Sequence, residues 1–179
     1  MKVVVIGGGW AGTAAAVEAK KAGADVVVLE KTDLLIGVGN VGGIMRNNGR
    51  FTAAEEMIAL GGGELFNITD KCSRHVNINF PAHNHASLYD VTKVEPEVRR
   101  YLYKIGVNII FEGRVVDVEK KGSKIEGVYL QDGTFIDGDV FIETTGSTGP
   151  MGNCVRYGKG CSMCILRCPA FGPRVSITQ

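Results

Sequence analysis

The stretch VVVIGGGWAGTAAAVEAKKAGADVVVLE, residues 3–30, decides the fold. Two short runs rich in β-branched residues, Val3 to Ile6 and Asp25 to Leu29, are typical of buried parallel strands. The alanine-rich segment between them suits a helix that packs closely on a sheet, and Gly23 is placed to end that helix. The order of strand, glycine turn, helix and strand predicts a βαβ unit, and with it an α/β domain built on a Rossmann-like parallel sheet.

Three glycines after the first expected strand match the pattern G-x-G-x-x-G: Gly7, Gly9 and Gly12. Gly7 permits the tight turn out of the strand, Gly9 lets a pyrophosphate approach the backbone, and Gly12 lets the helix lie close to the sheet. The pattern alone also occurs in plain turns. Its position between a strand and a helix favours a dinucleotide, whose phosphates would face the free amides at the helix start.

An acidic residue ends the second expected strand. Glu30 falls 18 positions after Gly12, where its carboxylate can accept hydrogen bonds from a pair of ribose hydroxyls. A 2'-phosphate would be repelled by the same charge. Lys31, the next residue, is grouped with Glu30 among the expected cofactor-binding residues.

Composition narrows the class of protein. A chain of 179 residues can form one domain and part of a second, and its formal net charge of +1 indicates no electrostatic capture of nucleic acid or of an anionic membrane. The first residues carry no basic segment followed by an apolar one, and no apolar span of about twenty residues occurs. These features predict a cytoplasmic protein.

The segments after residue 30 separate FAD domains from NAD domains. Residues 31–50 are rich in glycine and are expected to form a long loop whose amides lie along an extended cofactor, and a helix is expected from Glu95 to Ile105. Short β-rich runs then follow, with Asp132 and Gly133 as a hairpin turn, at residues 107–111, 114–119, 124–131, 134–136 and 139–143.

This order resembles the glutathione-reductase-like superfamily of FAD-dependent oxidoreductases, and within it the fumarate reductase flavoproteins and the glucose-inhibited division protein. The resemblance covers residues 1–150 and rests on the opening unit, on VEPEVRRYLYKIGVNIIFEGRVVDV and on GDVFIETTGSTG. It implies an FAD-binding domain over 1–150 with an inserted β-meander. The alternative for the β-rich segment is a purely structural meander.

The resemblance also implies the residues that bind FAD. The opening glycines would hold the pyrophosphate, Gly42 and Gly43 would approach the pyrophosphate or the ribityl chain, and Val116 would contact adenine through its backbone. The full expected set is Gly7, Gly9, Gly12, Glu30, Lys31, Gly42, Gly43, Val116, Thr145 and Gly146.

In one respect the sequence departs from this superfamily. Its flavoproteins continue into a substrate domain and then return to the FAD domain, whereas this sequence ends at Gln179. We therefore expect a second polypeptide, or an oligomeric copy of this chain, to complete the flavin site. A truncated chain is the alternative.

A cluster of cysteines distinguishes residues 151–179, a segment expected to lead toward a substrate domain or a partner subunit. Its spacing is C-x6-C-x2-C-x3-C-P, formed by Cys154, Cys161, Cys164 and Cys168. Four thiolates this close favour an iron-sulfur cluster that takes electrons singly from the flavin. Zinc, a dithiol that exchanges electrons with the flavin, and thiols without a role remain open.

Together these features predict an FAD-binding subunit of an oxidoreductase. A small substrate would pass a hydride to the flavin, and electrons would leave through the cysteine-held centre or an external acceptor. Amino acids, amines and hydroxy acids are implied only by the resemblance. The alternative is a noncatalytic subunit that binds FAD or ADP as a structural ligand. The catalytic residues stay unassigned, with His75, His83 and His85 as candidates.

Overall fold

The computed structural model describes residues 1–46, 49–146 and 176–178. Its centre is a parallel sheet in the order β10-β1-β2-β6, in which neighbouring strands pair without any register shift. The strands are β1 (Lys2–Ile6), β2 (Asp25–Leu29), β6 (Asn108–Ile110) and β10 (Val140–Glu143).

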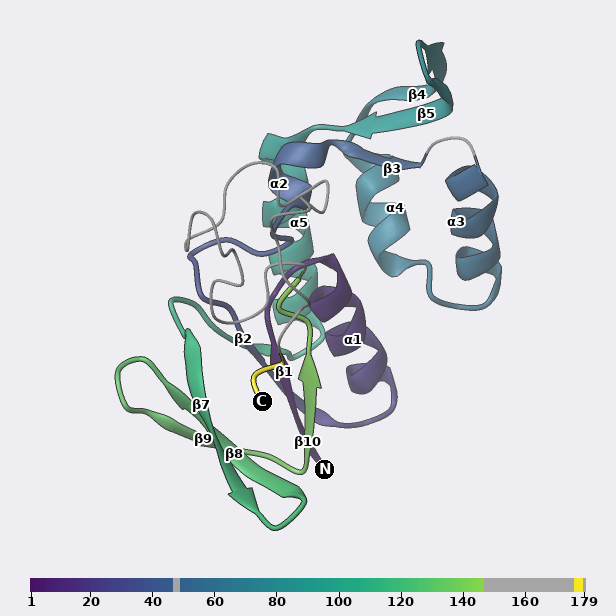
Figure 1. Ribbon diagram of the computed structural model, residues 1–179. Coiled ribbons are helices and arrows are strands. Elements are labelled where there is room, and N and C mark those ends of the chain that lie inside the picture. The colour runs from purple at the N-terminus through teal and green to yellow at the C-terminus, as the bar shows by residue number, and fades with distance from the viewer. Residues whose placement is uncertain (47–48, 147–175, 179) are drawn as a thin grey trace.

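Helices cover one face of this sheet, and a three-stranded meander covers the other (Figure 1). Alternation along β1 explains both layers, because Val3 and Val5 pack with the helices while Val4 and Ile6 pack with the meander. The helices are α1 (Trp10–Lys21) and α5 (Val91–Lys104), and the meander is β7 (Val115–Lys121), β8 (Lys124–Leu130) and β9 (Phe135–Asp137).

A peripheral lobe, formed by residues 39–89, lies beside this core (Figure 1). It contains an antiparallel sheet in the order β3-β5-β4, whose β4 and β5 form a hairpin that extends away from the body of the molecule (Figure 1). Its elements are α2 (Gly39–Gly42), β3 (Ile44–Arg46), α3 (Gly49–Ala59), α4 (Glu64–Lys71), β4 (Ser73–Phe80) and β5 (His83–Tyr89).

An aromatic contact joins the core to the lobe. Trp10, the first residue of α1, meets Tyr89 of β5 edge to face, with ring centroids 6.1 Å apart. The Tyr89 hydroxyl donates a hydrogen bond of 2.8 Å to the carbonyl oxygen of Gly39. Any Cβ on Gly39 would lie only 2.3 Å from Nε1 of Trp10, so α2 can pack on the indole only with glycine at position 39.

The α/β class, the parallel sheet and the inserted meander are confirmed, but two boundaries were predicted wrongly. Helix α5 begins at Val91, because the Asp90 carboxylate accepts a hydrogen bond of 3.0 Å from the amide of Thr92 and caps the helix there. Pro96 therefore lies inside the helix and not in its first turn. The expected loop over residues 31–50 contains helix α2, strand β3 and the start of helix α3.

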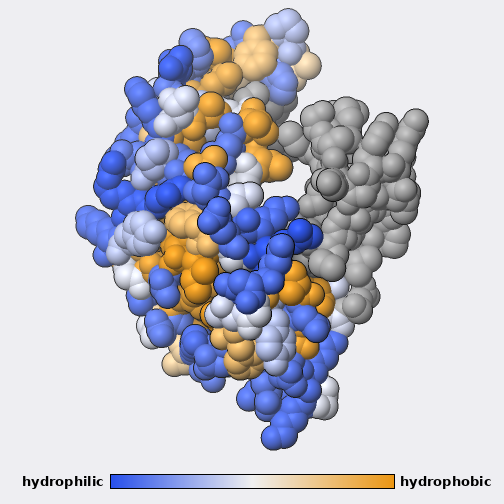
Figure 2. Space-filling model, turned by 90° about the vertical axis from the view of Figure 1, so that its left-hand side faces the viewer, coloured by the Kyte–Doolittle hydropathy of each residue, from blue (hydrophilic) through white to orange (hydrophobic). Residues whose placement is uncertain are grey.

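On the face shown in Figure 2, the apolar side chains of the described residues form patches between polar ones. Among the described residues, no helix is both long enough and apolar enough to cross a bilayer.

Candidate functional site

A cleft of about 670 Å³ opens at the carboxyl ends of β1, β2 and β10. Its walls come from the start of α1, the segment that follows β2, the residues before β7 and the residues after β10. In open α/β sheets, ligands bind in the crevice outside the carboxyl ends of the strands. The position of this cleft therefore makes it the candidate binding site.

The glycine turn after β1 forms the floor of the cleft. Gly7 has a φ of +103°, and a Cβ there would lie 2.6 Å from the carbonyl oxygen of Thr144. A Cβ on Gly12 would lie 1.8 Å from the carbonyl oxygen of Gly7, so this position must be glycine if α1 is to reach the turn. Gly9 differs, because no atom lies within 4 Å of its Cβ position and it lines the cleft.

The start of α1 presents backbone donors to the cleft. Gly9 is its N-cap residue, and no side chain caps it. Trp10 and Ala11, the first helical residues, line the cleft with Gly9. Because the first N–H groups of a helix have no partner within the helix, this end is suited to an anion such as a pyrophosphate.

Thr144, the residue after β10, holds the turn in place. Its hydroxyl donates to the carbonyl oxygens of Ile6 at 3.0 Å and of Gly7 at 2.7 Å, and its amide donates to the Ile6 oxygen at 2.8 Å. The side chain thus fixes the last residue of β1 against β10. Thr145 and Gly146 continue along the cleft wall.

Glu30 lies under the cleft at the end of β2 and is only 6% exposed. One carboxylate oxygen accepts a hydrogen bond of 2.7 Å from the amide of Gly8. The other accepts from the amide and the hydroxyl of Thr32, at 2.9 and 3.0 Å. The carboxylate therefore ties the glycine turn to the segment after β2, and Glu30 is one of the residues that line the cleft.

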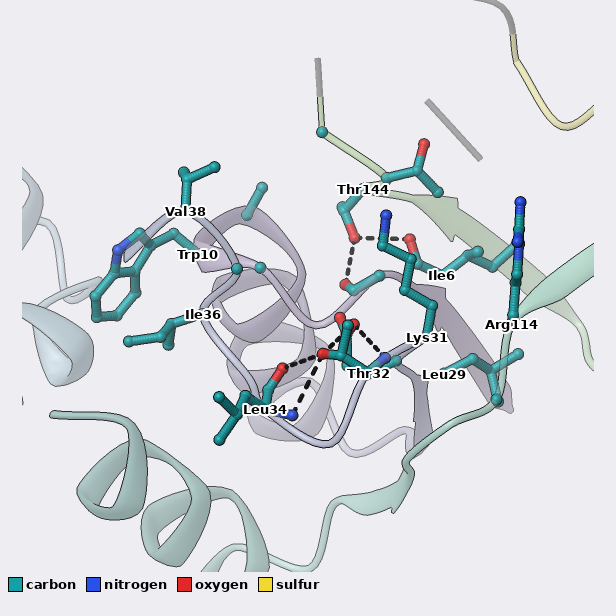
Figure 3. A pocket seen from close by; sticks show the side chains of 18 of the residues that line it. Ile6, Trp10, Leu29, Lys31, Thr32, Leu34, Ile36, Val38, Arg114 and Thr144 are labelled. Atoms are coloured by element: carbon teal, nitrogen blue, oxygen red, sulfur yellow. Dashed lines mark hydrogen bonds between the residues drawn. The ribbon is translucent and has the colours of Figure 1, made fainter. Parts of the chain in front are cut away.

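The two ends of the cleft differ in chemistry. Figure 3 shows Trp10, Ile36 and Val38 gathered at one end, while Lys31 and Arg114 extend side chains at the other. The apolar end suits a ring system, and the cationic end suits a polar or anionic group.

Most of the residues predicted from the sequence line this cleft: Gly7, Gly9, Glu30, Lys31, Thr145 and Gly146. Gly12 lies behind them, where it packs α1 on the turn. Gly42 and Gly43 lie at the end of α2 and are not part of the lining. The same holds for Val116, which points outward and is 36% exposed, while its neighbour Val115 is buried and lines the cleft.

The sequence reasoning missed several lining residues. They are Ile6, Trp10, Ala11, Leu29, Thr32, Asp33, Leu34, Ile36, Gly37, Val38, Asn40, Gly113, Arg114, Val115 and Thr144. Alternation along the meander offered a signal for Val115, because every second residue of a half-covered strand faces the core. The segment after β2 was expected to lie along the cofactor as a loop, but its individual residues gave no signal beyond the glycines.

Cys154, Cys161, Cys164 and Cys168 lie outside the described residues, and their expected metal stays a prediction. Within the parts of the chain that the structure describes, no group of three or more His, Cys, Asp or Glu side chains is placed to hold a metal ion. Cys72 is buried, and burial raises the pKa of its thiol.

The three histidines lie on the β4–β5 hairpin, away from the cleft. His83 packs on Phe80, with ring centroids 4.8 Å apart. Nδ1 of His85 lies 2.8 Å from Oδ1 of Asn77. Their expected contact with a substrate stays a prediction.

The parallel sheet, the glycine turn, the acidic residue at the end of β2 and the meander on one face define a dinucleotide-binding α/β domain. The family model described as "Glucose inhibited division protein A" matches residues 2–179, and the chain belongs to this family of FAD-binding proteins.

Solved structures share the fold. One is Aquifex aeolicus GidA, which is 22% identical and has a TM-score of 0.61; the match covers 83% of this chain and 25% of that one. CtdE in complex with FAD is 21% identical, with a TM-score of 0.61, and the match covers 84% of this chain and 39% of CtdE. The L-proline dehydrogenase from P. horikoshii is 14% identical, with a TM-score of 0.62, over 90% of this chain and 56% of the enzyme. The chain therefore spans between a quarter and just over half of these three solved chains.

Proposed function

We propose that this chain binds FAD in the cleft and serves as the FAD-binding part of an oxidoreductase. The observation that carries the proposal is the placement of two groups at one cleft: the uncapped start of α1 at Gly9, and the carboxylate of Glu30 at the end of β2. The first is suited to a pyrophosphate and the second to a ribose, which are neighbouring groups in FAD.

The residues that line the cleft suit FAD. Gly9 leaves open space above the backbone, and this space would be filled by a Cβ at the point where a phosphate must approach. The meander side supplies Arg114 and Val115 to the lining, directly before Val116, whose backbone is proposed to contact adenine. When bound, FAD supplies a ring that accepts a hydride from a substrate, and the residues of this chain bind and orient it.

Substitution of Gly9 tests this placement. Gly9→Val would put a branched side chain into the open space at the start of α1, and we expect the flavin absorption bands of the purified protein to disappear while its circular dichroism is unchanged. Ala14→Val, on the exposed side of the same helix, is the matched control and should retain flavin. Flavin retained by Gly9→Val at the level of the control would contradict the proposal.

An alternative proposal is that this chain binds a nucleotide but does not take part in catalysis. In it, the chain holds FAD or ADP as a structural ligand while another subunit reacts with the substrate. A yellow protein whose flavin is bleached under anaerobic conditions by an amino acid, an amine or a hydroxy acid supports the oxidoreductase. A colourless protein that contains only an adenine nucleotide supports the structural role.

We also propose onward electron transfer through a centre held by the four cysteines between residues 154 and 168. The spacing C-x2-C-x3-C-P supports this, because it resembles the end of bacterial ferredoxin motifs. Iron, sulfide and zinc analysis of anaerobically purified protein tests it. Iron with sulfide supports the cluster, and zinc supports a structural site. A protein that contains neither iron nor zinc would contradict the proposal.

A further polypeptide is proposed to cover the mouth of the cleft. Leu34, Val38 and Val41 are large apolar residues that are exposed there or on the adjoining α2. Exposed apolar groups of this kind favour contact with another protein surface. Size measurement of the native complex, with identification of any co-purified chain, tests the partner.

A further inference from the structure

One carboxylate outside the cleft holds the cleft wall to a helix. Glu95 of α5 is 5% exposed, and its Oε1 atom accepts a hydrogen bond of 3.0 Å from the backbone amide of Leu35. Leu35 belongs to the segment of residues 31–37, here called the wall segment, most of which lines the cleft. A side chain 60 positions away in sequence therefore fixes the backbone of this wall.

Arg99 completes the attachment. Its Nε and Nη2 atoms donate to the same Glu95 oxygen at 2.9 and 2.6 Å, and Nη2 also donates to the carbonyl oxygen of Asp33 at 2.7 Å. The guanidinium lies over the ring of Phe111, 4.3 Å from its centroid. The arginine thus neutralises a buried carboxylate and at the same time binds the wall segment directly.

The wall segment needs this attachment because of its position. It leaves β2 at Glu30, passes along the cleft and returns to the glycine turn, where the amide of Ile36 donates to the carbonyl oxygen of Gly8 at 2.7 Å. Its Asp33 and Leu35 backbone groups, halfway along, are held by Arg99 and Glu95. The side-chain amide of Asn40 also donates to the Leu35 carbonyl oxygen at 2.7 Å, so Glu95 and Arg99 add the bonds to the Leu35 amide and the Asp33 carbonyl oxygen.

We propose that Glu95 and Arg99 are positioning residues for the nucleotide site, which hold the wall segment in the conformation that binds the adenosine half of the cofactor. The inference rests on the proposed function of FAD binding. Neither residue lines the cleft, so both would act through the segment that they hold.

The effect on affinity follows from populations. If the wall segment occupies its binding conformation for only a fraction of the time, the apparent dissociation constant rises by the inverse of that fraction. Loss of the Glu95 carboxylate also leaves the Leu35 amide and the Arg99 guanidinium without their shared acceptor. We expect Glu95→Ala to raise the dissociation constants for FAD and for ADP by roughly tenfold or more.

Two further substitutions in α5 test this effect: one should have an intermediate effect on affinity, and the other is a control. Glu95→Gln keeps an oxygen that can accept from Leu35 and loses the charge, so its effect should lie between those of wild type and Glu95→Ala. Glu97→Ala removes a carboxylate that pairs with Arg100 on the exposed side of α5 and away from the cleft, so the affinity should be unchanged.

The experiment combines titration with hydrogen exchange. FAD and ADP affinities are measured by calorimetry for the wild type and the three variants, and amide exchange is followed for peptides that cover residues 31–37. We expect faster exchange there in Glu95→Ala and no change in Glu97→Ala. Equal affinities in all four proteins, or unchanged exchange over 31–37 in Glu95→Ala, would overturn the inference.

The outcomes separate the two proposals. A wild type that binds neither FAD nor ADP removes the proposed function, and the positioning role falls with it. A wild type that binds both, with Glu95→Ala equal to it, keeps the function and removes the positioning role alone. If Glu95→Ala does not fold, Glu95→Gln supplies the same comparison.

Discussion

The strand pair β1–β2 and the strand pair β4–β5 show two ways of using apolar residues. In β1, four of the five residues are buried, and Val4 is fully enclosed beneath the meander. In β4, no residue is buried, and Val76 is 67% exposed. The comparison teaches that a β-branched run predicts a strand, whereas burial depends on the layers that cover both of its faces.

The two pairs also differ in backbone geometry. The β1–β2 register is regular, and the residues with positive φ that flank α1 are glycines, Gly7 and Gly23. The β4–β5 register shifts three times, and positive φ falls on Asn77, Ala82 and His85. Positive φ therefore falls on glycine at both ends of α1 and on residues with side chains in the hairpin. The core has one such residue as well, because the buried Ile36 has a φ of +59°.

The largest effect should come from Gly12. Gly12→Ala forces a Cβ against the carbonyl oxygen of Gly7, and because this is backbone it cannot rotate away. We expect loss of folding, or a fall of about 3 kcal/mol or more in the free energy of unfolding, measured by urea denaturation. Gly9→Ala, which meets no atom within 4 Å, should stay within about 0.5 kcal/mol of wild type. Similar stability in the two variants would contradict the packing argument.

A matched pair of leucines measures the difference between core and lobe. Leu102→Ala opens a cavity on the buried side of α5 and should cost about 2–5 kcal/mol of unfolding free energy. Leu60, which follows α3 in the peripheral lobe, is 82% exposed, and Leu60→Ala should change stability by no more than about 0.5 kcal/mol. A large effect at Leu60 would mean that the lobe is covered by another surface.

An intermediate, pH-dependent effect on stability is expected at Asp90, whose carboxylate pairs with Arg74 of the peripheral lobe and caps α5 of the core. The Thr92 hydroxyl and the Arg74 guanidinium of β4 hold the pKa of the Asp90 carboxyl at about 2. Because the folded pKa is lowered, this contribution to stability is present above the ordinary aspartate pKa of about 4 and is lost as the pH falls toward 2.

Asp90→Asn tests this linkage. The variant should unfold at lower urea concentration than wild type at pH 7, and the gap should narrow as the pH falls from about 4 to about 2. Unfolding midpoints measured at several pH values check the expectation. A gap that stays constant with pH would show that the carboxylate charge is not responsible.

The smallest effect is expected at the tip of the hairpin. Ala82 has a φ of +67°, which costs alanine more than glycine. Ala82→Gly should therefore raise the free energy of unfolding by at most about 1 kcal/mol, because the added freedom of the unfolded chain offsets part of the gain. A clear loss of stability in urea denaturation would show that the hairpin tip is not strained.

The sequence predicted the core because local rules decide it. Runs of valine at the right length, glycines at the turn and the Asp132–Gly133 hairpin each act over a few residues. The start of α5 was within reach, since Val94, Val98 and Leu102 recur at helical spacing and Asp90 is a good cap. The predicted start was placed at Glu95 because proline is common in the first turn of a helix, whereas the helix begins after its cap Asp90.

The rest of the site could not be predicted from local rules. Glu95 reaches Leu35 across 60 positions, and the cleft wall between Thr32 and Val38 has no regular period. Val115, and not Val116, faces the cleft because the pairing of β7 with β8 sets which side of the strand is covered. Such facts depend on tertiary packing.

Trp10 has a practical consequence for work on this protein. It is the only tryptophan in the sequence, and it touches the cleft on one side and Tyr89 on the other. Its fluorescence emission therefore comes from a single point at the junction of core and lobe. An occupant of the cleft that absorbs in the near ultraviolet or blue would quench this emission by energy transfer, so the chain carries its own optical label.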